Sequence, residues 1–196
     1  MKKNSWWKLL IALAIYAVLV CLCASAGLID AACFAYIGTI FPLFFAFLYL
    51  FVAAQIKTFG AASFLNGFFL IMAIILGEAD LPLILGLIIF TTAAEIIRKI
   101  IGYEKLSGVK WSFVPLAYTF YAFSSHWWLD TKGTLEEARE SMREGYADRI
   151  AQVVSNIPAL VIALILVIPI AILGIFLATK IMKKNCIPAK LKFFKV

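Results

Sequence analysis

The chain has 196 residues, of which 64% are hydrophobic and 15% are charged, and it carries a net charge of +7. Soluble domains contain about 45–50% apolar residues, so this composition excludes a soluble protein and indicates a membrane protein. The apolar residues form consecutive spans rather than separable cores, and we therefore expect one integral membrane domain over residues 1–196. The basic residues fall between the apolar segments, where a lipid bilayer explains them better than nucleic acid does.

Six apolar segments have the composition of membrane-spanning helices, although the third and fifth are short. A helix rises about 1.5 Å per residue, so about 20 residues cross the hydrocarbon layer of about 30 Å while satisfying their own backbone hydrogen bonds. The second segment contains Pro42, which membrane helices tolerate. The expected fold class is all-α, a polytopic membrane protein with six transmembrane helices at residues 6–26, 33–54, 59–76, 81–101, 111–127 and 156–179.

The charged residues predict the orientation of these helices. With the amino terminus inside, fourteen of the eighteen Lys and Arg residues fall on the cytoplasmic side, and most acidic residues fall outside. Loops rich in Lys and Arg remain cytoplasmic. We therefore expect both termini, including the basic tail at residues 180–196, to be cytoplasmic. The tail is expected to anchor the last span at anionic headgroups, with docking of a partner subunit as the alternative.

The first segment also has features of a signal peptide. A basic stretch at residues 1–8 precedes it, and Ala24-Ser25-Ala26 is the kind of sequence that signal peptidase cuts. The apolar run exceeds the roughly 7–15 residues usual in a signal peptide, and a second span follows at once. We favour a retained first span, and cleavage is the alternative.

The four cysteines show no spacing typical of metal ligands. Two of them lie in the first span, and a third opens the second span. Free cysteine behaves as a small apolar residue in such surroundings. We expect packing roles and no metal site for Cys21, Cys23, Cys33 and Cys186.

A charged insert, residues 128–150, separates the fifth and sixth spans and is expected outside. Thr134 and Glu137 match a capping box, in which a hydroxyl and a carboxylate satisfy free amides at a helix start. Apolar residues then recur at spacings of three and four, which predicts an extracellular amphipathic helix. The apolar stripe comprises Leu135, Ala138, Met142, Tyr146 and Ile150.

Two interpretations of this insert remain open. It is either an interfacial helix that joins two spans beside an aromatic belt of Trp127 and Trp128, or a lid over a solute pocket. Long loops more often bind ligands than merely connect elements, which favours the lid.

Polar and aromatic side chains gather at the outer ends of the predicted helices. Each alone is typical of the membrane interface, but their convergence predicts an outward-facing pocket. The candidate substrate-binding residues are Tyr36, Thr39, Glu78, Tyr118, Tyr121, Ser125, His126, Trp127, Tyr146 and Asn156.

His126 is the only histidine. Imidazole can ligate a metal or haem iron, or act as a proton switch, but one histidine at a membrane boundary is more typical of a hydrogen-bonded interface residue. We expect no metal and no cofactor. The HExxH motif, the nucleophile elbow and the phosphate loop are all absent from the sequence, so we expect no enzymatic activity.

Three further features lie within the spans. Glu95 is expected to form an intrahelical ion pair with Arg98 or Lys99, or to extend towards the interface. Asn66 is expected to form a hydrogen bond across helices. Small residues four apart on the first span make a groove that packs within the chain or docks a partner membrane protein; they are Ala17, Cys21 and Ser25.

The sequence from "FGAASFLNGFF" through "REGYADRIAQVVSNIPALVIALILVIPIAILGIFLATKIMKK" resembles the Trep_Strep family of substrate-binding S components of energy-coupling factor (ECF) transporters. The resemblance covers essentially the whole chain and includes the "GYAD" element at residues 145–148. It implies a bacterial plasma-membrane protein that captures a micronutrient from outside. Such a protein then topples in the bilayer against a transmembrane coupling subunit driven by two cytoplasmic ATPases.

The resemblance also implies where the ligand and the partner bind. S components hold ligand with the outer ends of the fourth to sixth spans and with the first, third and fifth loops. These correspond here to the region near Asp30 and to residues 78–80, 118–128 and 155–156. Many S components dock through Ala-x-x-x-Ala on the first helix; this chain has Ala17, Cys21 and Ser25 at that spacing.

The leading hypothesis is therefore an S component that captures a vitamin-like or haem-like micronutrient. Aromatic residues favour a flat conjugated solute, whereas the external acidic residues favour a cation. A membrane structural or signalling protein, whose external helix binds a protein, is the alternative. A third hypothesis is an intramembrane enzyme that uses His126 with an external carboxylate.

Overall fold

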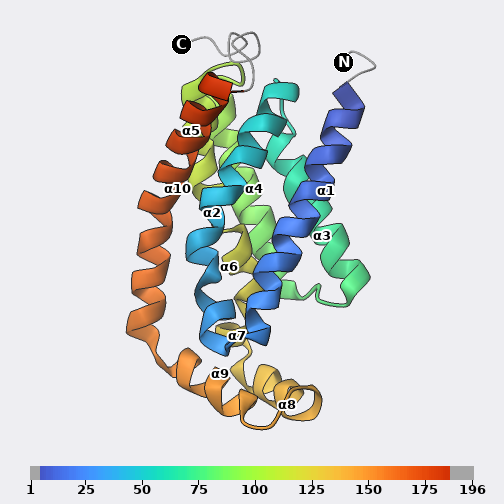
Figure 1. Ribbon diagram of the computed structural model, residues 1–196, viewed down its shortest axis with the longest axis vertical. Helices are drawn as coiled ribbons and strands as arrows, with labels where there is room; N and C mark the ends of the chain where they lie inside the picture. Colours follow the sequence, from blue (N-terminus) through green and yellow to red (C-terminus); the bar gives the residue numbers. More distant parts are fainter. Residues whose placement is uncertain (1–4, 186–196) are drawn as a thin grey trace.

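The computed structural model describes residues 5–185, which form an all-α bundle with no strand in that range (Figure 1). Residues 186–196 of the basic tail, including Cys186, lie outside the described residues. In chain order the elements are α1 (Ser5–Ala24), the 3-10 helix η1 (Ser25–Leu28), α2 (Ala31–Gln55), α3 (Ala61–Leu76), α4 (Leu81–Ile101), α5 (Leu106–Leu116), α6 (Thr119–Ser124), α7 (His126–Leu129), α8 (Thr131–Ser141), α9 (Tyr146–Ser155) and α10 (Ile157–Asn185).

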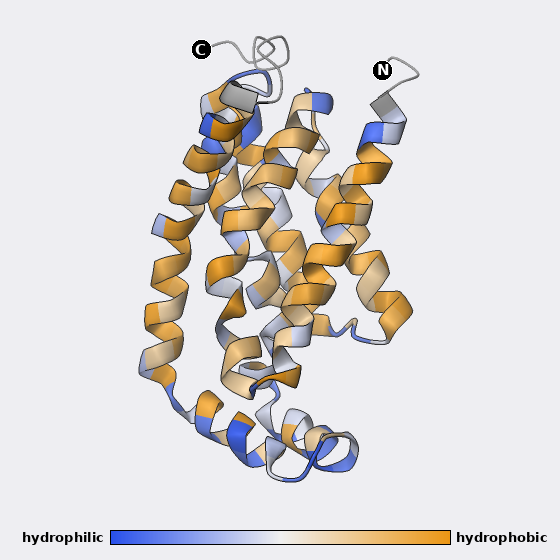
Figure 2. Cartoon of the chain, viewed as in Figure 1, coloured by the Kyte–Doolittle hydropathy of each residue, from blue (hydrophilic) through white to orange (hydrophobic). Residues whose placement is uncertain are grey.

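The long helices run side by side, and α1 begins at the same end of the bundle at which α10 ends (Figure 1). We call this the terminal end. Helices α8 and α9 lie across the opposite end, which we call the insert end. Figure 2 shows that the long helices are mostly hydrophobic and that hydrophilic residues concentrate at the insert end and the terminal end. This distribution is that of a polytopic membrane protein.

Four helical stretches are long and apolar enough to cross a bilayer: Trp6–Leu28, α2, α4 and α10. The third expected span, α3, has 16 residues and a length of roughly 24 Å. Large apolar side chains such as Leu22, Ile89 and Ile165 point out of the bundle and are more than half exposed. Their exposure is explained by contact with lipid.

The fifth expected span is not one continuous helix. In place of a helix over residues 111–127, the chain forms α5, α6 and α7, with a break at residues 117–118. Pro115 lies in the last turn of α5, and proline both lacks an amide hydrogen and clashes with the preceding turn. The prediction of a continuous span is wrong because it weighed hydropathy alone.

The charged insert forms two helices, not the single helix expected. Asp130, rather than Thr134, caps α8, and its Oδ1 accepts a hydrogen bond from the Gly133 amide at 3.1 Å. The Thr134 hydroxyl instead donates to the Asp130 carbonyl at 2.9 Å. The chain turns again at Gly145, whose φ of 78° lies in the left-handed region that glycine tolerates best. The predicted capping box is therefore wrong.

The break divides the predicted apolar stripe. Ala138, Tyr146 and Ile150 are buried, whereas Met142 is 55% exposed. Helical periodicity extrapolated across residues 142–145 placed Met142 in the same stripe, but the turn there changes the direction of the chain.

Helix α2 is the centre of the core. Its Phe45 ring stacks on Tyr16 of α1 with centroids 5.1 Å apart. On its other side α10 approaches so closely that a Cβ at Gly174 would lie 2.8 Å from the Pro42 carbonyl oxygen. Cys23 is buried in this core as expected, but Cys21 and Cys33 are exposed.

Asn66 joins three helices inside the bundle. Its Nδ2 donates to Thr91 Oγ1 of α4 at 2.8 Å, and its Oδ1 accepts from Thr119 Oγ1 of α6 at 3.0 Å. The prediction of a hydrogen bond across helices is confirmed. Asn66 and Thr119 are buried, so these hydrogen bonds also prevent the cost of leaving the Asn66 amide unsatisfied.

Glu95 has a different role from the one expected. Its Oε1 accepts hydrogen bonds from the amides of Gly60 and Ala62, at 3.1 and 2.8 Å, and so caps the start of α3. Arg98 is fully buried and donates to the Ile56 and Tyr103 carbonyls. The structure thus shows an interhelical cap where we expected an ion pair within α4.

We predict that Asn66→Leu lowers the free energy of unfolding by about 1–2 kcal/mol, because it removes the two hydrogen bonds that join α3 to α4 and α6. Thermal unfolding of the purified protein in detergent measures the effect. Gly67→Ala is the matched control, since its added Cβ has no neighbour within 4 Å. Equal stability of Asn66→Leu and the wild type would contradict this role.

Candidate functional site

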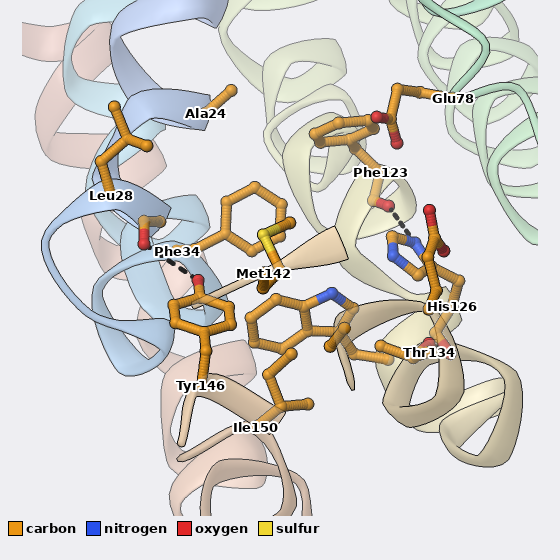
Figure 3. A pocket seen from close by; sticks show the side chains of 14 residues that line it. Ala24, Leu28, Phe34, Glu78, Phe123, His126, Thr134, Met142, Tyr146 and Ile150 are labelled. Carbon is orange, nitrogen blue, oxygen red and sulfur yellow. Dashed lines mark hydrogen bonds between the residues drawn. The ribbon is translucent and has the colours of Figure 1, made fainter. Parts of the chain in front are cut away.

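A cavity of about 260 Å³ lies at the insert end (Figure 3). Its walls come from the end of α1, the start of α2, the turn between α3 and α4, helices α6 and α7, and the charged insert. It therefore brings together segments from both halves of the chain. The lining residues are Ala24, Gly27, Leu28, Phe34, Glu78, Phe123, His126, Trp127, Thr134, Glu137, Ala138, Met142, Tyr146 and Ile150.

A second cavity, of about 480 Å³, lies towards the terminal end and is lined mainly by α3 and α4. It is larger, but Glu95, its only acidic lining residue, already caps α3. The cavity at the insert end combines aromatic walls with several convergent polar groups, which is the usual composition of a ligand pocket. We therefore take the cavity at the insert end as the candidate site.

Aromatic residues form the inner wall of this cavity. The Phe34 ring lies 4.9 Å from Trp127 and 5.8 Å from Phe123, centroid to centroid. Phe34 and Trp127 are buried, at 9% and 6% exposure. The planes of Trp127 and Phe123 are inclined at 36° and 70° to that of Phe34, so the three rings pack tilted and edge-to-face and form an apolar wall.

His126 lies at the edge of the cavity, beside Phe123 (Figure 3). Its Nδ1 is 2.9 Å from the Phe123 carbonyl oxygen and 3.5 Å from Oδ2 of Asp80. Both of these oxygens are acceptors, so Nδ1 carries the hydrogen, and in the neutral ring Nε2 is the acceptor. Asp80 also caps α4 through the Leu83 amide at 2.7 Å, which fixes this side of the cavity.

The second half of the charged insert is fastened to the loop between η1 and α2. The Tyr146 hydroxyl donates to the Gly27 carbonyl at 2.9 Å, and Arg143 donates to the Ile29 carbonyl at 3.2 Å. Arg149 forms an ion pair with Asp30 at 3.1 Å. These contacts place Tyr146 against the cavity, and burial raises the pKa of its phenol.

Asp30 serves two elements at once. Its Oδ1 accepts from the Ala32 amide at 2.8 Å and caps α2, while its carboxylate binds Arg149. The Ala32 hydrogen bond, followed by Arg149, lowers the pKa of Asp30. The amide at the start of α2 thus stabilises the ionised Asp30 carboxylate, which in turn binds Arg149 of α9.

Four of the ten predicted binding residues line the cavity: Glu78, His126, Trp127 and Tyr146. The other six lie outside it. Among these, Thr39 and Tyr121 hydrogen-bond to each other at 2.6 Å in the bundle interior. Tyr118 donates to the Leu164 carbonyl of α10 at 2.9 Å.

The remaining three predicted binding residues also lie outside the cavity, each in contact with its own part of the chain. Tyr36 lies on α2, and its hydroxyl oxygen is buried among protein atoms. The Ser125 hydroxyl donates to the Ala122 carbonyl, and Asn156 Oδ1 accepts from the Ala159 amide at the start of α10. These six side chains therefore contact other parts of the chain and do not line the candidate cavity.

Sequence reasoning missed Phe34, Phe123 and Glu137 as lining residues. Phe123 is four residues before Trp127, and that spacing could have placed both rings on one face. For Phe34 no local signal exists, because its position depends on how η1 turns the chain into α2.

The small residues of α1 are largely uncovered. Ala17 is half-buried, while Cys21 and Ser25 are exposed. Ser25 begins η1, and its hydroxyl donates to the Leu22 carbonyl of α1. Packing within this chain is therefore wrong for Cys21 and Ser25, and docking of a partner remains the other alternative.

A family model described as "Hypothetical bacterial integral membrane protein (Trep_Strep)" matches residues 8–186. The matched range includes every residue that lines the cavity. No curated protein and no solved structure matches the chain.

We predict that the contact between α9 and the η1–α2 loop weakens in acid. The folded-state pKa of Asp30 is depressed, so its stabilising effect is present above about pH 4, the ordinary range of Asp, and is lost as the pH falls through the depressed value. The midpoint of thermal unfolding, measured from pH 6 to pH 2, should fall less in Asp30→Asn than in the wild type.

Glu140→Gln is the control, because it removes a carboxylate from the exposed surface of α8. It should keep the wild-type pH profile. If Asp30→Asn and Glu140→Gln have the same profile, Asp30 does not hold the insert.

Proposed function

We propose that this chain, which belongs to the Trep_Strep family of hypothetical bacterial integral membrane proteins, captures a small solute beneath the charged insert. In this proposal it is the substrate-binding S component of an ECF-type importer. The observation that carries the proposal is the cavity of about 260 Å³, walled by aromatic rings and roofed by the insert.

The size of the cavity favours a small solute. Drug-sized ligands occupy pockets of about 300–1,000 Å³, and this cavity lies just below that range. A compact, vitamin-sized molecule is therefore favoured over a haem-like macrocycle. The Phe34 and Trp127 rings, tilted 36° against each other, supply aromatic contact for such a molecule.

The proposal assigns capture to this chain and energy to its partners. A transmembrane coupling subunit and two cytoplasmic ATPases would drive delivery, and no catalytic step is assigned to His126. The uncovered face of α1 around Cys21 and Ser25 supports docking of the coupling subunit, because small residues let two membrane helices approach closely.

A membrane structural or signalling protein is the second candidate. The exposed acidic face of α8 favours it, since Glu136 and Glu140 point away from the bundle. Copurification of the chain with the coupling subunit and an ATPase pair distinguishes the importer from this alternative. Recovery with an extracellular protein alone would favour the second candidate.

We predict that the charged insert faces the outside of the cell. In a background without Cys21, Cys23, Cys33 and Cys186, a membrane-impermeant maleimide should label Glu140→Cys on intact cells. Thr58→Cys, an exposed position at the terminal end, is the control and should react only after the cells are opened. The reverse pattern would invert the bundle and remove the uptake role.

We predict that Trp127→Ala weakens capture of the retained solute by about tenfold or more, as loss of a buried aromatic anchor does at binding sites. Native mass spectrometry of the purified protein measures the bound fraction. Met142→Ala alters the cavity wall at a more exposed residue and tests the same site with less risk to folding.

Tyr121→Phe is the control for both variants, because the hydroxyl that it removes contacts Thr39 outside the cavity. It should retain solute as the wild type does. Unchanged retention in both Trp127→Ala and Met142→Ala would place the binding site elsewhere.

A further inference from the structure

The charged residues that line the cavity are all acidic. Glu78 comes from the turn between α3 and α4, and Glu137 comes from α8; among the fourteen lining residues none is Lys or Arg. Asp80 lies just behind the wall, 3.5 Å from His126 Nδ1. A solute in this cavity therefore meets negative charge from two separate elements.

Three of the four basic residues of the insert have partners on its outer side. Arg149 pairs with Asp30, and Arg143 lies over the Tyr146 ring with its guanidinium carbon 5.6 Å from the ring centroid. Arg143 also donates to the Ile29 carbonyl. Lys132 lies 4.0 Å from Glu136 on the exposed surface of α8. These partners reduce the positive potential that reaches the cavity.

Aromatic rings also line the cavity, and their faces attract positive charge. Phe34, Phe123, Trp127 and Tyr146 all line the cavity, and the face of an aromatic ring carries partial negative charge. Cations near such faces are attracted, and the attraction grows where water is excluded. Phe34 and Trp127 are both buried, so their faces are largely shielded from water.

We infer that the solute is a small organic cation, with an ammonium or cationic heterocyclic centre held by the Phe34, Phe123 and Trp127 rings and neutralised by Glu78 and Glu137. This inference rests on the proposed function and adds the chemical class of the substrate. It disfavours an anionic macrocycle on two grounds: a cavity of about 260 Å³ is small, and its carboxylates repel negative charge.

Three probes of nearly equal shape separate charge from size. They are 3-hydroxyphenyltrimethylammonium, its uncharged isostere 3-tert-butylphenol, and the anion 3-tert-butylbenzoate. Isothermal titration calorimetry on the full chain in lipid nanodiscs, with empty nanodiscs as blanks, gives each affinity. The cation should bind at least about tenfold more tightly than the phenol, and the benzoate should bind weakest.

Variants that remove one carboxylate each show which residues cause the preference for the cationic probe. Glu78→Gln and Glu137→Gln should each weaken binding of the ammonium probe by about threefold to tenfold and leave binding of the phenol unchanged. Glu140→Gln, on the same helix as Glu137 but outside the cavity, is the matched control and should change neither.

The outcomes separate this inference from the proposed function. If the phenol or the benzoate binds at least as tightly as the cation, and Trp127→Ala abolishes that binding, the cavity captures solutes but the cation inference is wrong. If none of the probes binds and native mass spectrometry finds no retained molecule, both the inference and the proposed function fail.

Discussion

Every backbone amide and carbonyl inside the hydrocarbon layer has to be satisfied within the protein, and the rest of this structure depends on that constraint. It explains why long apolar helices make up the bundle, and why irregular backbone gathers at the two ends. The break between α5 and α6 lies within the bundle, where Tyr118 packs on Phe90 of α4, and the amides of residues 117 and 118 still find carbonyl partners. The short α7 and the turn at Gly145 lie at the insert end. Free polar groups and a cavity become possible there because water can reach that region.

The fold was largely predictable, since hydropathy is a local property that marks each span independently. The broken fifth span was not, because hydropathy averaged over residues 111–127 does not register the effect of Pro115 on the helix. Of the residues predicted for the site, Trp127 and Tyr146 line the candidate cavity, whereas Tyr121 lies outside it. The approximate level of a residue along the bundle follows from sequence position, whereas the direction in which its side chain points depends on how neighbouring helices rotate and pack.

The polar residues within the bundle show that burial in a membrane does not by itself indicate function. Asn66 links α3, α4 and α6, and Glu95 caps α3, so both stabilise the architecture. At the insert end, by contrast, His126 and Trp127 share a cavity with polar groups that the helices do not use as caps. The site is therefore identified by the cavity that these side chains share.

Asp30 belongs to two parts of the molecule, because it begins α2 and also binds Arg149 of α9. Helix α2 is in turn locked to α10 by the close approach at Gly174. In the proposed uptake cycle, in which the bundle tilts in the bilayer, these contacts would carry α9 and α10 along with α2. A molecule enclosed beneath the insert would then travel with its roof in place, and release would require the contacts of Arg149, Tyr146 and Arg143 to break.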